Sequence, residues 1–320
     1  MRKIKRILDL KKETINYINK CPFRVSVVTA SHSTIHYHES DIELIYCLYG
    51  TAEILCNHEQ VTLNKGQIFT IDYRDIHCIF SKDDNCLIVF HIDMKNVYLP
   101  QDYLEYVYLA CQDITCKKRQ QNALRKVKKM VLASSLMYLQ DGSDHVSQYK
   151  EAADNIIKVL CSEFDLFNTL HDEKISNDEL HIRMHNIIKH CQQNYSNKIT
   201  LSSLAKEIHI NENYFSQFMR SSTYGSFSNM LGYIRSYEAQ YLLLTTEYSI
   251  LTISHMCGFS NDKYFYRYFK RWWNKTPQEY RYWVQNYIKE PEKMYYFEKE
   301  ESLQILSDYI SGFFILDAFK

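Results

Sequence analysis

One pattern of short apolar helices occurs twice in the last third of the sequence, and this repeat limits the fold more than any other feature. In the first copy, apolar residues recur at helical spacing from Leu201, and a second set follows the polar residue Asn211 over 212–222. The second copy starts at Ile250, an offset of 49 residues, and its second helix follows Ser260 as a cap. Two short helices across a tight turn form a helix-turn-helix unit, so the sequence predicts two such units.

A further helical run, Phe227 to Leu244, connects the two copies, although Gly232 in its middle costs about 1 kcal/mol relative to alanine. Two recognition helices in one chain suit double-stranded DNA, because successive major-groove segments on one face lie about 34 Å apart. The stretch from Lys263 to Arg281 has six basic residues and one acidic residue, Glu279. A solvated helix face would carry the same charge, so charge alone leaves both interpretations open.

Residues 182–283 resemble the DNA-binding domain of the AraC/XylS family of transcriptional regulators. The departures are small: Ser254 stands where alanine is usual, and Met230 where tyrosine is usual. The resemblance implies binding to double-stranded promoter or operator DNA, and contact with RNA polymerase if the protein is an activator. The matching residues are Leu201, Leu204, Ala205, Tyr214, Phe215, Phe218, Arg220, Phe227, Leu231, Arg235, Ala239, Leu242, Leu243, Ser249, Ile250, Ile253, Gly258, Phe259, Ser260, Tyr264, Phe265, Arg267, Phe269, Lys270, Thr276, Pro277, Tyr280 and Arg281.

The resemblance also implies which side chains face DNA. On each recognition helix, the positions left after removing the apolar ones match the family's base-contacting positions: Asn213, Ser216 and Gln217 in the first unit, and Lys263, Tyr266 and Arg267 in the second. Asn and Gln suit adenine edges whereas Arg and Lys suit guanine, so we expect the second unit to depend more on guanine. Phosphate contacts are expected from Arg220, Arg235, Lys270 and Arg271.

The N-terminal segment is predicted to form strands. Between Arg24 and Ile92, short β-branched and aromatic runs alternate with polar turn clusters, such as residues 57–59. This spacing is typical of hairpins in a small antiparallel barrel.

Histidines and a glutamate in this segment have a spacing that resembles the cupin family, whose first motif is H-x-H-x(3,4)-E-x6-G. The residues that match this motif in full are His36, His38, Glu43 and Gly50. The second motif keeps Gly66 and His77 at the right interval. Its proline, glycine and asparagine are replaced by Asp72, Arg74 and Ser81.

We predict that His36, His38, Glu43 and His77 line an effector pocket in the barrel. Residues two apart on a strand point to the same side of the sheet, so His36 and His38 can converge. The same four residues are suitable ligands for a divalent metal ion, or could simply be hydrogen-bonded at the mouth of the barrel. Because the second motif departs from the cupin pattern, we expect an organic effector and no metal or other cofactor.

Helical periodicity returns at Lys117 and, after a break at 142–144, predicts two helices that pack on the barrel or on a second subunit. The last thirty residues also have helical spacing and are expected to pack on the DNA-binding domain. The predicted fold is α+β. It comprises a cupin-like antiparallel β-barrel over 1–116, a helical linker or dimerisation region over 117–179, an all-α domain with two helix-turn-helix units over 180–290, and a helical tail over 291–320.

The overall charge hides this organisation. The chain has 38 Lys and Arg against 38 Asp and Glu, yet residues 21–116 have five basic and thirteen acidic side chains, whereas 180–290 have thirteen basic and seven acidic. The ten cysteines form no C-x-x-C pair, no secretory signal follows the basic N-terminus, and no apolar stretch is long enough to span a bilayer. We therefore expect a cytoplasmic protein with reduced thiols and no membrane partner.

These features together predict a ligand-responsive transcription factor that acts as a homodimer and is not an enzyme. Its effector would be a small molecule bound in the barrel, with sugars as one class. One alternative is a metal-dependent cupin enzyme that uses His36, His38, Glu43 and His77. The other is a DNA-binding protein whose barrel serves only for dimerisation.

Overall fold

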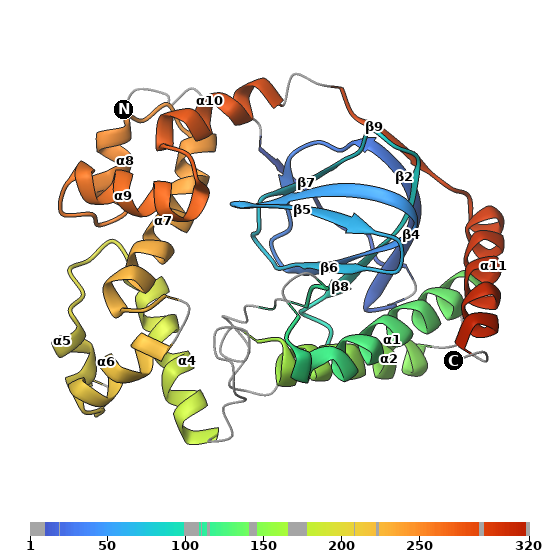
Figure 1. Cartoon of the computed structure of the whole chain (residues 1–320), viewed down its shortest axis with the longest axis horizontal. Coiled ribbons are helices and arrows are strands. Elements are labelled where there is room, and N and C mark those ends of the chain that lie inside the picture. Colours follow the sequence, from blue (N-terminus) through green and yellow to red (C-terminus); the bar gives the residue numbers. More distant parts are fainter. Residues whose placement is uncertain are drawn as a thin grey trace.

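The computed structural model describes residues 10–18, 20–98, 109, 111–113, 116–140, 146–165, 178–207, 209–221, 224–287 and 291–317. Figure 1 shows a barrel of strands with helices against one face, and an all-helical domain beside it. The predicted order of barrel, helical region and two helix-turn-helix units is confirmed. The predicted boundaries after residues 116, 179 and 290 stay predictions, and residues 114–115, 166–177 and 288–290 near them lie outside the described part of the chain.

The barrel is one continuous sheet of nine described strands, which closes because β7 pairs with both β2 and β4. β4 has four partner strands, since its first half pairs with β6 and β8 and its second half with β5 and β7. Gly50 lies between these two halves of β4 with φ +68°. A Cβ atom there would lie 1.9 Å from the carbonyl oxygen of Asp84, so only glycine fits. The strands are β1 (Lys11–Lys12), β2 (Phe23–His32), β3 (His36–Tyr37), β4 (Asp41–Cys56), β5 (Glu59–Asn64), β6 (Ile68–Ile71), β7 (His77–Phe80), β8 (Asn85–Asp93) and β9 (Lys293–Tyr296).

Two helices cover the outer face of β2, β8 and the first half of β4, and Figure 1 shows both helices along one side of the barrel. They are α1 (Gln121–Gln140), which follows the short 3-10 helix η2 (Lys118–Gln120), and α2 (Val146–Glu163). Phe23 of β2 points outward, and its ring meets Tyr138 of α1 and Tyr149 of α2 at centroid distances of 5.9 and 5.5 Å. The two predicted helices therefore pack on the barrel of their own chain.

The C-terminal segment returns to the barrel. β9 pairs antiparallel with β2, with Val28 opposite Tyr296, and so covers the free edge of that strand. α11 (Lys299–Asp317) then packs on α1, and the hydroxyl of Tyr309 lies 2.9 Å from that of Tyr46. The expectation that this tail packs on the DNA-binding domain is thus wrong: Leu306 is buried, and Leu303 and Ile310 are partly buried, in the core that the barrel shares with α1 and α2. The side chains of residues 313–317 lie outside the described part of the chain.

The all-α domain contains the two predicted units. The first is α5 (Leu201–Glu207) and α6 (Glu212–Ser221), and the second is α8 (Ile250–Met256) and α9 (Asp262–Trp273). α4 (Asp178–Gln193) precedes them, α7 (Phe227–Thr245) connects them and α10 (Pro277–Tyr287) follows. Asn211 caps α6 as predicted, but the cap of α9 is Asn261 rather than Ser260, because the Asn261 side chain accepts from the backbone of Tyr264.

Gly232, in the middle of α7, has a packing role. A Cβ atom there would lie 2.5 Å from the ring of Tyr268 on α9. Glycine therefore lets the connecting helix approach the second recognition helix closely, at the cost in helix propensity noted above. None of the described helices is long and apolar enough to cross a membrane.

Candidate effector cavity and nucleic-acid interface

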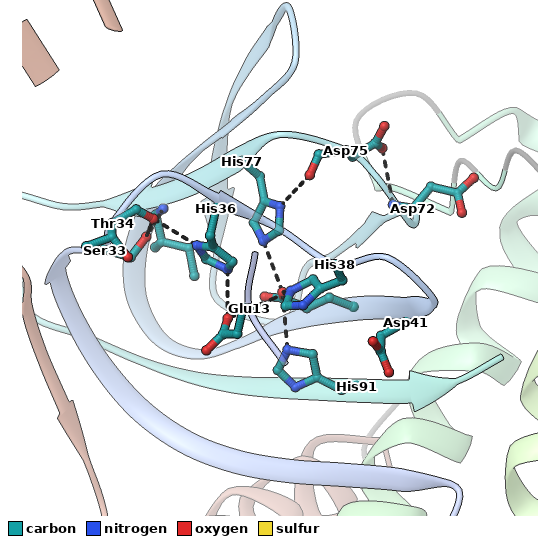
Figure 2. A network of polar contacts seen from close by, with 12 residues as sticks. Glu13, Ser33, Thr34, His36, His38, Asp41, Asp72, Asp75, His77 and His91 are labelled. Carbon is teal, nitrogen blue, oxygen red and sulfur yellow. Dashed lines mark hydrogen bonds and ion pairs between the residues drawn. The ribbon is translucent and has the colours of Figure 1, made fainter. Parts of the chain in front are cut away.

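The four residues predicted for the barrel pocket lie together inside it. Their ligand-capable atoms are within 4.8 Å of one another, and all four residues are buried. The four side chains come together because β3 and β4 both pair with β7, and His36 lies directly opposite His77 across the sheet. Figure 2 shows the three histidines turned toward one another.

Glu43 lies at the centre of this cluster. Its Oε2 atom is 2.9 Å from His38 Nε2 and 3.1 Å from His77 Nε2. A third imidazole, that of His91, approaches the same oxygen to 3.4 Å. One carboxylate oxygen thus faces three imidazole nitrogens, out of contact with solvent.

The sequence prediction missed two members of the cluster, His91 and Glu13. His91 lies on β8 directly opposite Glu43 of β4, so strand alternation and the correct pairing of the two strands would have identified it. Glu13 directly follows the short strand β1, and its carboxylate lies 3.1 Å from His36 Nε2. No sequence motif marks Glu13, because its position depends on how residues 10–18 fold back over the barrel.

Burial and neighbouring charges shift the pKa values of these groups in different directions. The hydrogen bond from His36 lowers the pKa of Glu13 to about 2. Burial opposes protonation of His36, but the hydrogen bond and charge of Glu13 and the charge of Glu43 outweigh it and raise the pKa of His36. Burial, helped by the charge on His36, lowers the pKa of His77 to about 4. Where His36 is protonated it forms an ion pair with Glu13, whereas His77 is neutral near pH 7.

The cluster fits a divalent metal ion by the chemistry of its donors. His36 and His77 donate from Nδ1 to the carbonyl oxygens of Thr34 and Asp75, at 2.8 and 2.9 Å. This leaves each Nε2 directed into the cavity, the orientation usual for metal-binding histidines. The Nδ1 atoms of His38 and His91 are buried and make no hydrogen bond within the described part of the chain, and His91 Nε2 has only its 3.4 Å approach to Glu43. Buried imidazole nitrogens without a partner are costly unless an ion or ligand engages them.

The cavity around these side chains has a volume of about 90 Å³. The segment from Lys11 to Ile15 lines one part of it, and Glu292, Met294 and Tyr296 of the C-terminal segment line another. Pockets for drug-sized ligands typically have 300–1,000 Å³. In this closed form the cavity therefore suits an ion or a very small polar molecule, and a sugar would require the covering segments to move.

The recognition helices α6 and α9 have the same burial pattern. Phe215 and Met219 in α6, and Phe265 and Phe269 in α9, are buried at equivalent positions. The predicted base-contacting side chains lie on the opposite side, where Asn213, Gln217, Lys263 and Arg267 are exposed and Ser216 and Tyr266 are partly exposed. Between the two units lies a hollow of about 780 Å³, whose lining includes Ser216, Arg220 and Arg267.

Three of the predicted phosphate-contacting residues, Arg220, Lys270 and Arg271, are exposed. Arg235 has a different environment, because its guanidinium donates to the carbonyl oxygens of Tyr195 and Asn197, each at 2.8 Å. A phosphate contact by Arg235 stays a prediction, but these bonds commit two of its five N–H donors to the loop before α5.

Arg281 on α10 does the same for the second unit. It donates to the carbonyl oxygens of Thr246 and Tyr248, which precede α8, and to that of Leu243. Each unit thus has an arginine, on the helix after its recognition helix, that holds the loop before its first helix. The repeat seen in the sequence therefore extends to this arginine.

Comparison with known proteins gives two matches to domain families. Residues 204–282 match a helix-turn-helix domain and residues 23–93 match a cupin domain. The chain is 28% identical over 131 residues to the Msm operon regulatory protein of Streptococcus mutans, covering 41% of this chain and 47% of that protein. It is 22% identical over 237 residues to an uncharacterized HTH-type transcriptional regulator of Staphylococcus aureus, covering 74% of this chain and 31% of that protein. The chain spans less than half the length of these two relatives.

Solved structures with similarity include that of ToxT from Vibrio cholerae, at 16% identity and a TM-score of 0.42, covering 82% of this chain and 98% of that one. Another is the C-terminal domain of AraT, a response regulator from Geobacillus stearothermophilus, at 29% identity and a TM-score of 0.29, covering 31% and 84%. The fold assignment rests on the strands and helices described above and on the two domain-family matches.

Proposed function

We propose that this chain, which is an AraC-type helix-turn-helix protein with an N-terminal cupin domain, is a DNA-binding regulator of transcription that responds to a small effector in its barrel. The observation that carries the proposal is the matched pair of recognition helices, which bury equivalent apolar positions and leave polar side chains exposed on the opposite side. Such a protein would act in the cytoplasm, as a homodimer, and would contact RNA polymerase if it is an activator.

Selection of DNA from a random-sequence pool by the purified chain tests the DNA-binding part. We expect enrichment of one sequence motif, with Arg267→Ala relaxing the preference for guanine at one position, because a bidentate base contact is worth about 1–3 kcal/mol. Glu301→Ala, an exposed position on α11, is the matched control and should select the same motif. A selected pool indistinguishable from the starting pool would refute the proposal.

The barrel cavity would hold the effector, with His36 and Glu43 among its lining residues and with His38 and His77 in contact with Glu43. Its small volume and its charged lining favour a small polar ligand over an apolar one. By linkage, an effector that changes DNA affinity by some factor must have its own affinity changed by DNA by the same factor. Equal effector affinity with and without the selected DNA would exclude coupling at equilibrium.

A divalent metal ion is a second candidate for the ligand of this cavity, favoured by the buried Nδ1 atoms of His38 and His91, which have no hydrogen bond to a described residue. Two groups of residues could hold it, either His36, His38, Glu43 and His77 or Glu13, His38 and His91. A bound ion would supply Lewis-acid polarisation of a small ligand, which is also what a cupin enzyme would need. Elemental analysis and titration with Zn²⁺ test this: His91→Ala should weaken binding at least about tenfold, whereas His255→Ala on exposed α8 should not.

A further inference from the structure

The turn between β4 and β5 makes a polar contact between the barrel and the all-α domain. Asn57, in a left-handed conformation with φ +51°, and His58 form the tip of this hairpin. The His58 ring lies 5.2 Å from the ring of Trp273, the last residue of α9, and 5.9 Å from that of Tyr233 on α7. Figure 1 shows this end of the barrel turned toward α7. The hairpin tip thus touches both the connecting helix and the second recognition helix.

Hydrogen bonds connect this tip to the cavity. His77, whose Nε2 faces Glu43, donates from Nδ1 to the carbonyl oxygen of Asp75 at 2.9 Å. The carboxylate of Asp75 accepts from Asn57 Nδ2 at 2.7 Å. Two more hydrogen bonds join Asn57 to Ile76. The backbone N–H of Asn57 donates to the carbonyl oxygen of Ile76, and the backbone N–H of Ile76 donates to Asn57 Oδ1. A displacement of His77 therefore reaches Asn57 through one short loop.

The hydrogen bonds continue from the tip into the all-α domain. Gln240 on α7 donates from Nε2 to Asn57 Oδ1 at 2.9 Å. Gln240 Oε1 accepts from the indole N–H of Trp273. Tyr237, one turn earlier on α7, donates its hydroxyl hydrogen to Asp75 at 2.9 Å. The path from the cavity to the recognition helix is therefore unbroken.

These groups are shielded from water. Gln240 is 1% exposed, Trp273 2% and Asn57 7%. A buried amide that loses its partner cannot replace it with water, so the two sides of the contact must move together or separate. This gives the contact two discrete states, docked and undocked, rather than a continuous range.

We propose that Asn57, Asp75 and Gln240 are positioning residues that connect the state of the barrel cavity to the orientation of the second recognition helix. The inference rests on the proposed function and names the contact through which it is regulated. α9 is a single helix of 12 residues, and Arg267 lies six residues before Trp273, about 9 Å along the axis. A tilt imposed at Trp273 is thus carried to the base-contacting side chains.

A double-mutant cycle tests the inference with DNA affinity as its readout. We expect His77→Ala to change the Kd for the selected DNA by at least about fivefold, the lower end of typical coupling. In a Gln240→Leu background the same change should have less than a twofold effect, because this variant already lacks the hydrogen bonds from Gln240 to Asn57 and Trp273. Glu238→Gln removes a 3.4 Å ion pair with Arg74 across the same boundary but off the path, and should leave the effect of His77→Ala intact.

An equal effect of His77→Ala in both backgrounds, or no effect in either, would overturn the inference while leaving DNA binding established. Should His77→Ala not fold, His77→Gln takes its place. The indole N–H resonance of Trp273, assigned through Trp273→Phe, gives a readout without DNA. It should move in the His77 variant and in Gln240→Leu, with Trp283 as the internal reference. An unmoved Trp273 resonance in the His77 variant would refute the connection even if no DNA were bound.

Discussion

The side-chain amide of Gln240 donates a 2.9 Å hydrogen bond to Asn57 across the boundary between the helical domain and the barrel. Gln240 also accepts from Trp273, so its amide is used on both sides. Gln240→Leu leaves the indole N–H and the Asn57 oxygen with one partner fewer in a buried place. We expect the free energy of unfolding to fall by about 1–3 kcal/mol, measured by urea denaturation. Gln60→Leu, at an exposed position of β5, should change it by less than about 0.5 kcal/mol.

The ion pair between Glu13 and His36 predicts a pH dependence. The lowered pKa of Glu13 contributes stability that is complete above its ordinary value of 4.5 and is lost as the pH falls through about 2. The raised pKa of His36 contributes stability that is complete below its ordinary value of 6.5 and is lost as the pH rises through the raised value. The pair therefore stabilises most between about pH 4.5 and 6.5.

Glu13→Gln should lower the pKa of His36. The substitution removes the charge of Glu13, which favours the protonated ring, while burial still opposes protonation. Titration of the histidine ring resonances by NMR measures this directly. Glu39→Gln is the control, since Glu39 lies near the same segment but pairs with Lys12. A His36 pKa unchanged by Glu13→Gln would show that the carboxylate does not hold the proton there.

The two arginines Arg220 and Arg235 should differ on DNA, although both were expected at phosphates. Arg220 is exposed beside the hollow between the units, whereas Arg235 donates to two carbonyl oxygens. Arg220→Gln should reduce the slope of log K against log salt concentration by about 0.9. Arg235→Gln should lower the free energy of unfolding instead, by about 1–3 kcal/mol, and leave the slope unchanged. A slope that falls in both variants would restore Arg235 to the phosphate contacts.

The sequence predicted the features that depend on local periodicity. Leu201 and Ile250 begin equivalent helices, as the 49-residue offset indicated, and the rings of His36 and His38 converge as strand alternation indicated, with their centroids 5.2 Å apart. Asn261 rather than Ser260 caps α9, because two adjacent polar residues can both serve and only backbone geometry decides.

Residues whose roles depend on distant parts of the chain could not be predicted in this way. Glu13 contacts His36 from the segment that follows β1, and Met294 belongs to a strand added from the C-terminal segment. In the sequence, Gln240 is one polar residue of a helix, and its role depends on its contact with Asn57 at the hairpin tip. Arg235 matched the family pattern, yet a match does not distinguish a phosphate contact from a bond to the chain's own carbonyl groups.

Gly232 and Gly312 provide a matched pair of helix glycines with opposite expected effects. Alanine at either position gains up to about 1 kcal/mol of helix propensity. At Gly312 of α11 no atom lies within 4 Å of the new Cβ, so Gly312→Ala should raise the free energy of unfolding by up to that amount. At Gly232 the new Cβ would lie 2.5 Å from the Tyr268 ring, and overpacking costs about 1–3 kcal/mol, so Gly232→Ala should be neutral to destabilising. Because Tyr268 also holds Arg267 through its hydroxyl at 3.0 Å, only Gly232→Ala should weaken DNA binding. Equal stabilisation by both substitutions would mean that α7 and α9 are not packed as closely as described.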